Sequence, residues 1–245
     1  MRSLALLLLV AGWAWCGAAQ AACDRSAFRV AIDVGHDRTH PGATSARGQN
    51  EFEYNLALSE LVLRQLMAAG FTGSFRIGES GAPITLASRP ALARAGRASV
   101  FVSLHHDSAQ KRYFSSWTYN GRVLPFSDEF HGYSIFVSAG SPLAAQNIAM
   151  ATDLGRALRA AGLTPSLHHA ALVEGEGRTL LNPNLGIYQF DQLAVLRGAT
   201  TPALLLESGV IVNREEEQAI RSGAYHPKIA AALVDALTAY CNGRR

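Results

Sequence analysis

The sequence has few cysteines and no extended basic segment. Three cysteines occur among 245 residues, which is too few for a disulfide-rich scaffold. The formal net charge is +3, and the longest basic run is Arg244-Arg245. The sequence therefore predicts no nucleic-acid partner. Repeats, low-complexity tracts and interdomain linkers are absent as well, and 49% of the residues are hydrophobic, which is typical of one globular domain with a sizeable core.

The N-terminal apolar run is too short to span a membrane. Residues 4–16 follow Arg2 and precede Ala19-Gln20-Ala21, the small-x-small pattern that signal peptidase accepts. A membrane-spanning helix needs about 20 apolar residues. We therefore predict a signal peptide over residues 1–21, a mature chain over residues 22–245 without a membrane span, and a periplasmic or secreted location. A retained membrane anchor is the alternative.

Cleavage after Ala21 would leave two cysteines, Cys23 and Cys241, near opposite ends of the mature chain. The termini of a domain are often close together, and an oxidising compartment favours disulfides. The pattern predicts a Cys23–Cys241 disulfide, with two free thiols as the alternative.

Strand-like and helix-like segments alternate along the mature chain. Near-continuous apolar strands between helices are typical of a largely parallel sheet that is buried on both faces. We therefore predict a single α/β domain with a mostly parallel central sheet covered by helices on both faces. Residues 109–131 and 164–189 fit no regular element, and such long loops are expected to form the walls of a cleft. The predicted strands are 28–34, 74–77, 99–104, 132–138 and 203–206, and the predicted helices are 51–69, 84–95, 144–161, 214–221 and 227–240.

Polar residues follow the first strand at the start of the next helix. His36 comes directly after that strand, and Gly35 would permit a tight exit from the sheet edge. Asn50 and Glu53 have the spacing of a capping box, which leaves Glu51 free to face the loop that begins at His36. Two structural interpretations compete, in which His36 only donates a hydrogen bond and Glu51 only interacts with the helix dipole.

Two further polar residues end apolar strands. His105 or His106 could each be a ligand from the local sequence, and the position at the strand terminus favours His105, with Asp107 able to orient an imidazole. Glu207 follows four apolar residues, where desolvation would raise its pKa and suit a general base. A buried ion pair between Glu207 and Arg197 is the structural alternative.

These residues are expected to meet at one edge of the sheet. Ligands bind in open α/β sheets at the carboxyl ends of the strands. His36, Glu51 and His105 would form the His2Glu set that holds one catalytic zinc ion with an open position, and Glu207 would be the base. We expect the loop pair His168-His169 to be exposed to solvent and outside this site.

The same residues lie in four motifs that resemble those of the zinc-dependent N-acetylmuramoyl-L-alanine amidases of the type 3 family, which hydrolyse the bacterial cell wall. Departures from the family pattern occur in the first motif, where Asp37-Arg38 replaces Gly-Gly and His40 replaces Asp. The matching segments are residues 32–43 (IDVGHDRTHPGA), Glu51 with Asn55-Leu56, residues 101–107 (FVSLHHD), and residues 205–213 with Glu216 beyond.

The resemblance implies a zinc amidase domain over residues 22–245. Its ligands would be His36, Glu51 and His105, and its catalytic residue would be Glu207. The implied reaction is hydrolysis of the amide between N-acetylmuramic acid and the L-alanine of the peptidoglycan stem peptide. Two alternatives stay open, a zinc carboxypeptidase or other peptidoglycan peptidase and a non-catalytic wall-binding domain of the same fold. The need for a protein activator and the roles of His40, His106, His168 and His169 also stay open.

Overall fold

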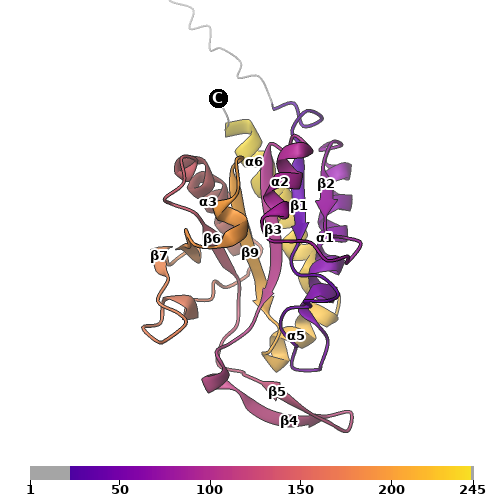
Figure 1. Ribbon diagram of the computed structural model, residues 1–245, viewed down its shortest axis with the longest axis vertical. Helices are drawn as coiled ribbons and strands as arrows, with labels where there is room; N and C mark the ends of the chain where they lie inside the picture. The colour runs from indigo at the N-terminus through magenta and orange to yellow at the C-terminus, as the bar shows by residue number, and fades with distance from the viewer. Residues whose placement is uncertain (1–22, 244–245) are drawn as a thin grey trace, which may run out of the picture.

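The central element of the fold is a seven-stranded sheet. A computed structural model describes residues 23–243 (Figure 1). The strands are arranged in the order β2-β1-β3-β9-β6-β8-β7. Their bounds are Val30–Val34 for β1, Phe75–Ile77 for β2, Val100–Asp107 for β3, Ser134–Val137 for β6, Thr179–Asn182 for β7, Ile187–Gln189 for β8 and Ala203–Val210 for β9.

Most of the strand pairs are parallel, as predicted. Strand β1 pairs with β2 and β3 in parallel, and the pairs β3–β9 and β6–β8 are parallel too. The antiparallel pairs are β6–β9 and β7–β8. The sheet is therefore mixed, with a parallel block of β2, β1, β3 and β9 that carries the predicted site residues at its carboxyl edge.

Helices cover both faces of the sheet, which confirms the predicted α/β class. Helices α1, α3 and α6 bury one face in a large apolar cluster that includes Ile32, Leu104 and Leu206. Helices α2 and α4 cover the other face around Phe101 and Leu205. The helix bounds are Glu51–Ala68 for α1, Ser88–Ala95 for α2, Ala144–Ala160 for α3, Ala194–Arg197 for α4, Arg214–Arg221 for α5 and Tyr225–Gly243 for α6. No helix among residues 23–243 has both the length and the apolar character needed to cross a membrane.

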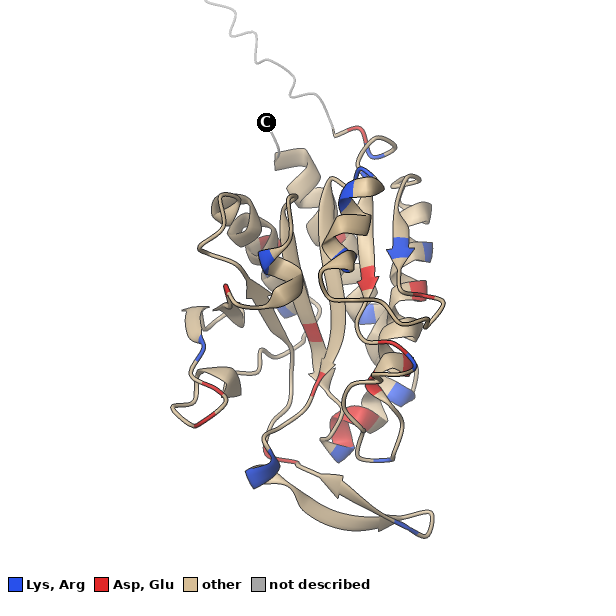
Figure 2. Cartoon of the chain, viewed as in Figure 1, with Lys and Arg blue, Asp and Glu red and all other residues tan. Residues whose placement is uncertain are grey.

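The central strands carry very little charge, because both of their faces are buried. Figure 2 shows most charged residues on helices and loops. Strands β1, β3, β6 and β9 together contain three residues of the Asp, Glu, Lys and Arg types, which are Asp33, Asp107 and Glu207. All three are acids. The electrostatics of the carboxyl edge therefore depend on which positively charged or hydrogen-bonding groups lie next to each carboxylate.

Several strands differ from the sequence prediction. Strands β3 and β9 continue to Asp107 and Val210, so that His105 and Glu207 lie inside strands and not beyond them. The segment 109–131 contains a hairpin of β4 (Ser115–Tyr119) and β5 (Arg122–Phe126), which projects beyond the sheet in Figure 1. The segment 164–189 contains β7 and β8, which join the main sheet. These strands carry few consecutive apolar residues, so apolar patterning did not detect them.

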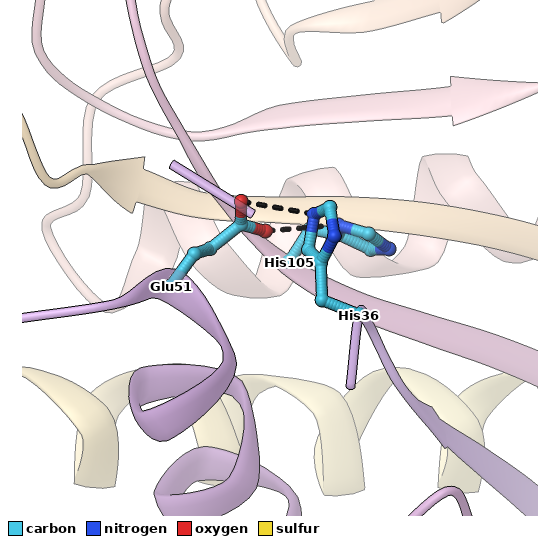
Figure 3. Close-up of side chains that lie close together, drawn as sticks. All are labelled: His36, Glu51 and His105. Atoms are coloured by element: carbon cyan, nitrogen blue, oxygen red, sulfur yellow. Dashed lines mark hydrogen bonds and ion pairs between the residues drawn. The ribbon is translucent and has the colours of Figure 1, made fainter. Parts of the chain in front are cut away.

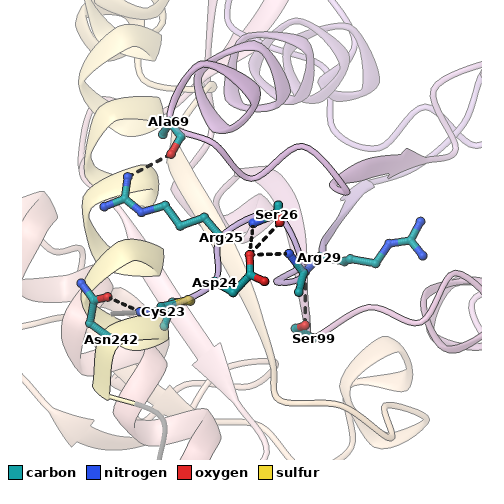
Figure 4. Close-up of a disulfide and its surroundings, with 10 residues drawn as sticks. Cys23, Asp24, Arg25, Ser26, Arg29, Ala69, Ser99 and Asn242 are labelled. Carbon is teal, nitrogen blue, oxygen red and sulfur yellow. Dashed lines mark hydrogen bonds between the residues drawn. A yellow bond between two sulfur atoms is a disulfide. The ribbon is translucent and has the colours of Figure 1, made fainter. Parts of the chain in front are cut away.

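The two ends of the described chain are joined by a disulfide. Cys23 and Cys241 are bonded across 218 residues of sequence, with Cα atoms 5.6 Å apart. Figure 4 shows the bond between the N-terminal segment and the end of α6. Nearby, the Arg25 guanidinium donates a hydrogen bond to the Ala69 carbonyl at 2.9 Å. The predicted disulfide is therefore present, whereas the predicted signal peptide lies outside the described residues.

Loss of this disulfide is expected to lower the free energy of unfolding by about 2–5 kcal/mol, because the bond closes nearly the whole chain into one loop. Urea unfolding of the wild type and of the Cys23→Ser/Cys241→Ser variant, each with and without reductant, measures the effect. Reductant should destabilise the wild type and leave the variant unchanged. An equal response of the two proteins to reductant would contradict the prediction.

Candidate metal centre

Three side chains converge at the carboxyl edge of the sheet. The Glu51 carboxylate, in the first turn of α1, lies between two imidazoles (Figure 3). Its Oε2 atom is 3.0 Å from His36 Nε2, and its Oε1 atom is 2.9 Å from His105 Nδ1. One potential ligand atom from each residue lies within 4.8 Å of the others. The structure thus brings together the three residues that the sequence analysis selected as a ligand set.

Hydrogen bonds from the surrounding backbone and from Asn55 fix the Glu51 carboxylate. The Ala43 backbone N–H donates to Oε2 at 3.1 Å. The Asn55 side-chain amide donates to Oε1 at 3.2 Å and to the Gly35 carbonyl at 3.1 Å. Although burial opposes the change, the hydrogen bonds from His105 and His36 lower the pKa of Glu51 well below its usual range. Glu51 is therefore an ionised, oriented carboxylate.

Two glycines leave room for this group. A Cβ atom at Gly35 would overlap the His105 ring, and one at Gly42 would overlap the Glu51 carboxylate and the His36 ring. Gly35 does not have a positive φ at the tight exit from β1; the residue with positive φ there is His36 itself, at +68°. Gly35 instead allows the close approach of an imidazole to the backbone.

A buried ion pair supports the chain at His36. Arg89 of α2 donates to Asp33 Oδ1 at 2.8 Å, and it also donates to the carbonyls of Val34 and His36 at 2.5 and 2.6 Å. The other Asp33 oxygen accepts a hydrogen bond from the Ser103 hydroxyl at 2.6 Å. Arg89 thus holds the backbone on both sides of Gly35. Arg89 is not among the predicted site residues, because a lone arginine in a helix carries no local signal of burial.

The predicted capping box is not formed. The Asn50 side chain makes no capping hydrogen bond, and Glu53 is paired with Arg38 at 3.7 Å on the surface. Glu51 nevertheless faces His36, because α1 begins at Glu51 and its first turn faces the loop that follows β1.

Glu207 stands opposite His105 in the register of the parallel strands β9 and β3. Its Oε2 atom is buried and accepts no hydrogen bond from residues 23–243, so the alternative of an ion pair with Arg197 is not observed. Burial, together with the negative charges of Asp107 and Glu51, raises the pKa of Glu207 well above its usual range. The side chain is thus an unpaired carboxyl group beside the three converging residues.

The other histidines fall into separate environments. His106 is buried on the far face of β3 from His105, and its Nδ1 donates to Asn55 Oδ1 at 2.7 Å. Burial and the neighbouring His226 lower the pKa of His106 well below its usual range, so it acts as a structural neutral imidazole. His40 is exposed, and the altered loop before it is closed by Asp37, whose Oδ1 accepts the backbone N–H groups of Thr39 and His40, each at 2.8 Å.

The expectation that His168 and His169 are exposed is wrong. His168 is 8% exposed and stacks on Phe130, with ring centroids 4.7 Å apart. His169 Nε2 lies 2.8 Å from Asp107 Oδ2, and its Nδ1 lies 2.9 Å from Glu176 Oε2. Burial opposes the change, but the charges and hydrogen bonds of Asp107 and Glu176 raise the pKa of His169 to about 9. Contacts with distant segments bury the two histidines, and the local sequence does not indicate those contacts.

A cavity of about 310 Å³ lies beside the carboxyl ends of β3 and β9. His105 and Glu207 line it together with Asp107, His169, Glu176 and Arg178. The predicted loop 164–189 therefore forms one wall of a cleft, as expected. The cavity offers two imidazoles, three carboxylates and one guanidinium to a bound molecule.

The sequence resembles those of known amidases. The profile of the N-acetylmuramoyl-L-alanine amidase family matches residues 30–239. The probable N-acetylmuramoyl-L-alanine amidase AmiB of Haemophilus influenzae is 28% identical over 237 residues, which cover 88% of this chain and 52% of that protein. A putative N-acetylmuramoyl-L-alanine amidase of Buchnera aphidicola is 25% identical, over 87% of this chain and 96% of that protein. The chain thus spans about half the length of the Haemophilus relative.

Solved structures show the same fold. The catalytic domain of CwlV, an N-acetylmuramoyl-L-alanine amidase from Bacillus (Paenibacillus) polymyxa, superimposes with a TM-score of 0.64 at 23% identity, over 89% of this chain and 99% of that one. The amidase Ami1 of Mycobacterium smegmatis superimposes with a TM-score of 0.68 at 17% identity, over 90% and 100% of the two chains. The family profile covers nearly all of the described residues, and the chain therefore belongs to the N-acetylmuramoyl-L-alanine amidase family.

Proposed function

We propose that this protein is a zinc-dependent hydrolase that cleaves the amide between N-acetylmuramic acid and the L-alanine of the peptidoglycan stem peptide. The observation that carries the proposal is the convergence of His36, Glu51 and His105 beside the unpaired Glu207. Membership of the amidase family supports the choice of bond. Further proposals follow from the sequence, namely a cleaved signal peptide over residues 1–21, a catalytic domain over residues 22–245 and a periplasmic or secreted location.

The three converging residues fit a zinc ion. Two imidazole nitrogens and one carboxylate oxygen are a donor set that zinc enzymes use with one position left open. The absence of a Cβ atom at Gly35 and Gly42 makes room for these side chains, since a Cβ atom at either position would overlap them. A zinc ion held by His36, Glu51 and His105 would lower the pKa of a water molecule towards 7 and polarise the amide carbonyl.

Glu207 would act as the general base. Its carboxylate would accept a proton from the attacking water and then donate it to the departing amine of L-alanine. The charge of Glu51 is one cause of the raised pKa of Glu207. Neutralisation of Glu51 by a bound cation would therefore lower the pKa of Glu207 towards the range that suits a base near neutral pH.

The cavity residues would orient the stem peptide. Arg178 lines the cavity with Glu207, and its guanidinium lies over the Phe190 ring, 4.2 Å from the centroid. A guanidinium in this position can pair with a carboxylate of the stem peptide.

Digestion of purified sacculi tests the bond that is cleaved. We expect free stem peptides that begin with L-alanine, together with glycan strands that lack peptides, because the cut separates lactyl group from peptide. Mass spectrometry of the products, with and without a chelator, measures this. Stems shortened at the C-terminus and still attached to sugar would indicate a carboxypeptidase instead. Bound zinc with no cleavage of any kind would indicate a wall-binding domain.

Glu207→Gln is expected to bind zinc normally and to lose about 10²–10⁴-fold in hydrolysis rate, because the amide cannot accept the proton of water. Metal analysis and the rate of release of stem peptides measure the two effects. Glu60→Gln, on the exposed side of α1, is the matched control and should keep the wild-type rate. Near-native activity of Glu207→Gln would exclude the assigned role.

Gly35→Ala is expected to weaken zinc binding by about 10–100-fold, as loss of ligand support typically does. The added methyl group would displace the His105 ring while leaving all three ligands in the chain. Competition with a zinc indicator measures the affinity. Gly243→Ala is the control, since a Cβ atom there meets no other atom within 4 Å. Wild-type affinity in Gly35→Ala would show that the close approach of His105 is not required.

A further inference from the structure

Two histidines and an aspartate converge at a second point, where Asp107 and His169 line the same cavity. Asp107 Oδ2 lies 2.8 Å from His169 Nε2 and 3.5 Å from His168 Nε2. The three potential ligand atoms are within 4.8 Å of one another. Donor atoms that share one tetrahedral ion, with bonds of about 2.0–2.1 Å, are separated by about 3.3 Å. The spacing of these three atoms is therefore already close to that of a metal site.

The remaining ring nitrogens have the partners that a metal-binding histidine uses. His169 Nδ1 donates to Glu176 Oε2 at 2.9 Å, and Gln110 donates to the other oxygen of Glu176 at 2.9 Å. His168 Nδ1 lies 2.8 Å from the Ser166 hydroxyl. A hydrogen bond from one ring nitrogen to a carboxylate or other oxygen fixes the tautomer and presents the second nitrogen to the ion. Both Nε2 atoms are presented in this way to Asp107.

The side chains of this cluster do not satisfy one another completely. His169 lies between two carboxylates, with Nε2 2.8 Å from Asp107 and Nδ1 2.9 Å from Glu176. His168 Nε2, in contrast, has no hydrogen-bond partner within residues 23–243, although the side chain is buried. A metal ion at the meeting point would bind this nitrogen, His169 Nε2 and Asp107 together. Buried polar atoms without partners are rare in folded proteins and call for such an explanation.

We propose that Asp107, His168 and His169 bind a second divalent transition-metal ion of the zinc type, with Glu176 and Ser166 orienting the two imidazoles. Nitrogen and carboxylate donors suit zinc and its first-row neighbours. The ion would join β3 to the segment 164–189 and would lie in the same cavity as Glu207. This site uses none of the residues of the His36–Glu51–His105 group, so it does not depend on the proposed function.

Metal counting on the untagged protein tests the proposal. After removal of bound metal, equilibrium dialysis against Zn²⁺ should give two ions per chain in the wild type. His36→Ala and His168→Ala should each retain one ion, and the double variant should retain none. Glu176→Gln, which keeps all three ligands, should weaken the second ion by about 10–100-fold and leave the first unchanged. His131→Ala, which removes an exposed histidine outside both groups, should retain two.

The outcomes separate the two sites. A single ion in the wild type, lost in His36→Ala and retained in His168→Ala, would overturn the second site and leave the first intact. Two ions that persist in both His168→Ala and Glu176→Gln would place the second ion elsewhere and would also overturn it. Circular dichroism checks the fold of each variant. If His168→Ala does not fold, the wild-type stoichiometry and the affinity of Glu176→Gln decide the question.

Discussion

The buried contact between Arg89 and Asp33 is the constraint on which the rest of the site depends. Arg89 is 2% exposed and Asp33 is fully buried, so neither charge can be satisfied by water. Loss of one partner of such a pair costs about 3–5 kcal/mol, because the other charge remains uncompensated. The same guanidinium binds the carbonyls of Val34 and His36. It therefore holds His36 at positive φ, a conformation that costs about 1–3 kcal/mol and persists only where surrounding contacts determine it.

The sequence predicted the architecture because the central strands are buried on both faces. Continuous apolar runs at β1, β3 and β9 identified the parallel block, and the helices between them followed from their apolar stripes. Strands β3 and β9 extend further than predicted. The prediction ended each strand at its last apolar side chain, whereas backbone hydrogen bonds continue the pairing through the polar residues. His105 and Glu207 remain paired in register although both are polar. The exposed strands β4 and β7 escaped detection for the opposite reason, since they are short of apolar residues.

The site was predictable where position along a strand determines position in space. His36 follows one strand, His105 and Glu207 lie near the carboxyl ends of two others, and neighbouring parallel strands bring such residues to one edge. Contacts from distant segments were not predictable in this way. His168 is buried because Phe130 stacks on it and Asp107 faces it, and neither contact leaves a trace in the local sequence. The close approach of the His105 ring to Gly35 was unpredictable for the same reason, since the two residues are 70 positions apart in the chain.

The charges at the carboxyl edge point to a cation. Asp33 is compensated by Arg89, Glu51 by two imidazoles and Asp107 by His169. Glu207 has no such partner among the described residues, and its Oε2 atom is buried. A carboxylate in this environment is costly unless positive charge is nearby. A divalent ion can replace a proton on the imidazoles beside Glu51 and Asp107. Each such replacement would add positive charge near Glu207. The same electrostatic demand explains why the unpaired Glu207 lies close to two acids, Glu51 and Asp107, that are each surrounded by histidines.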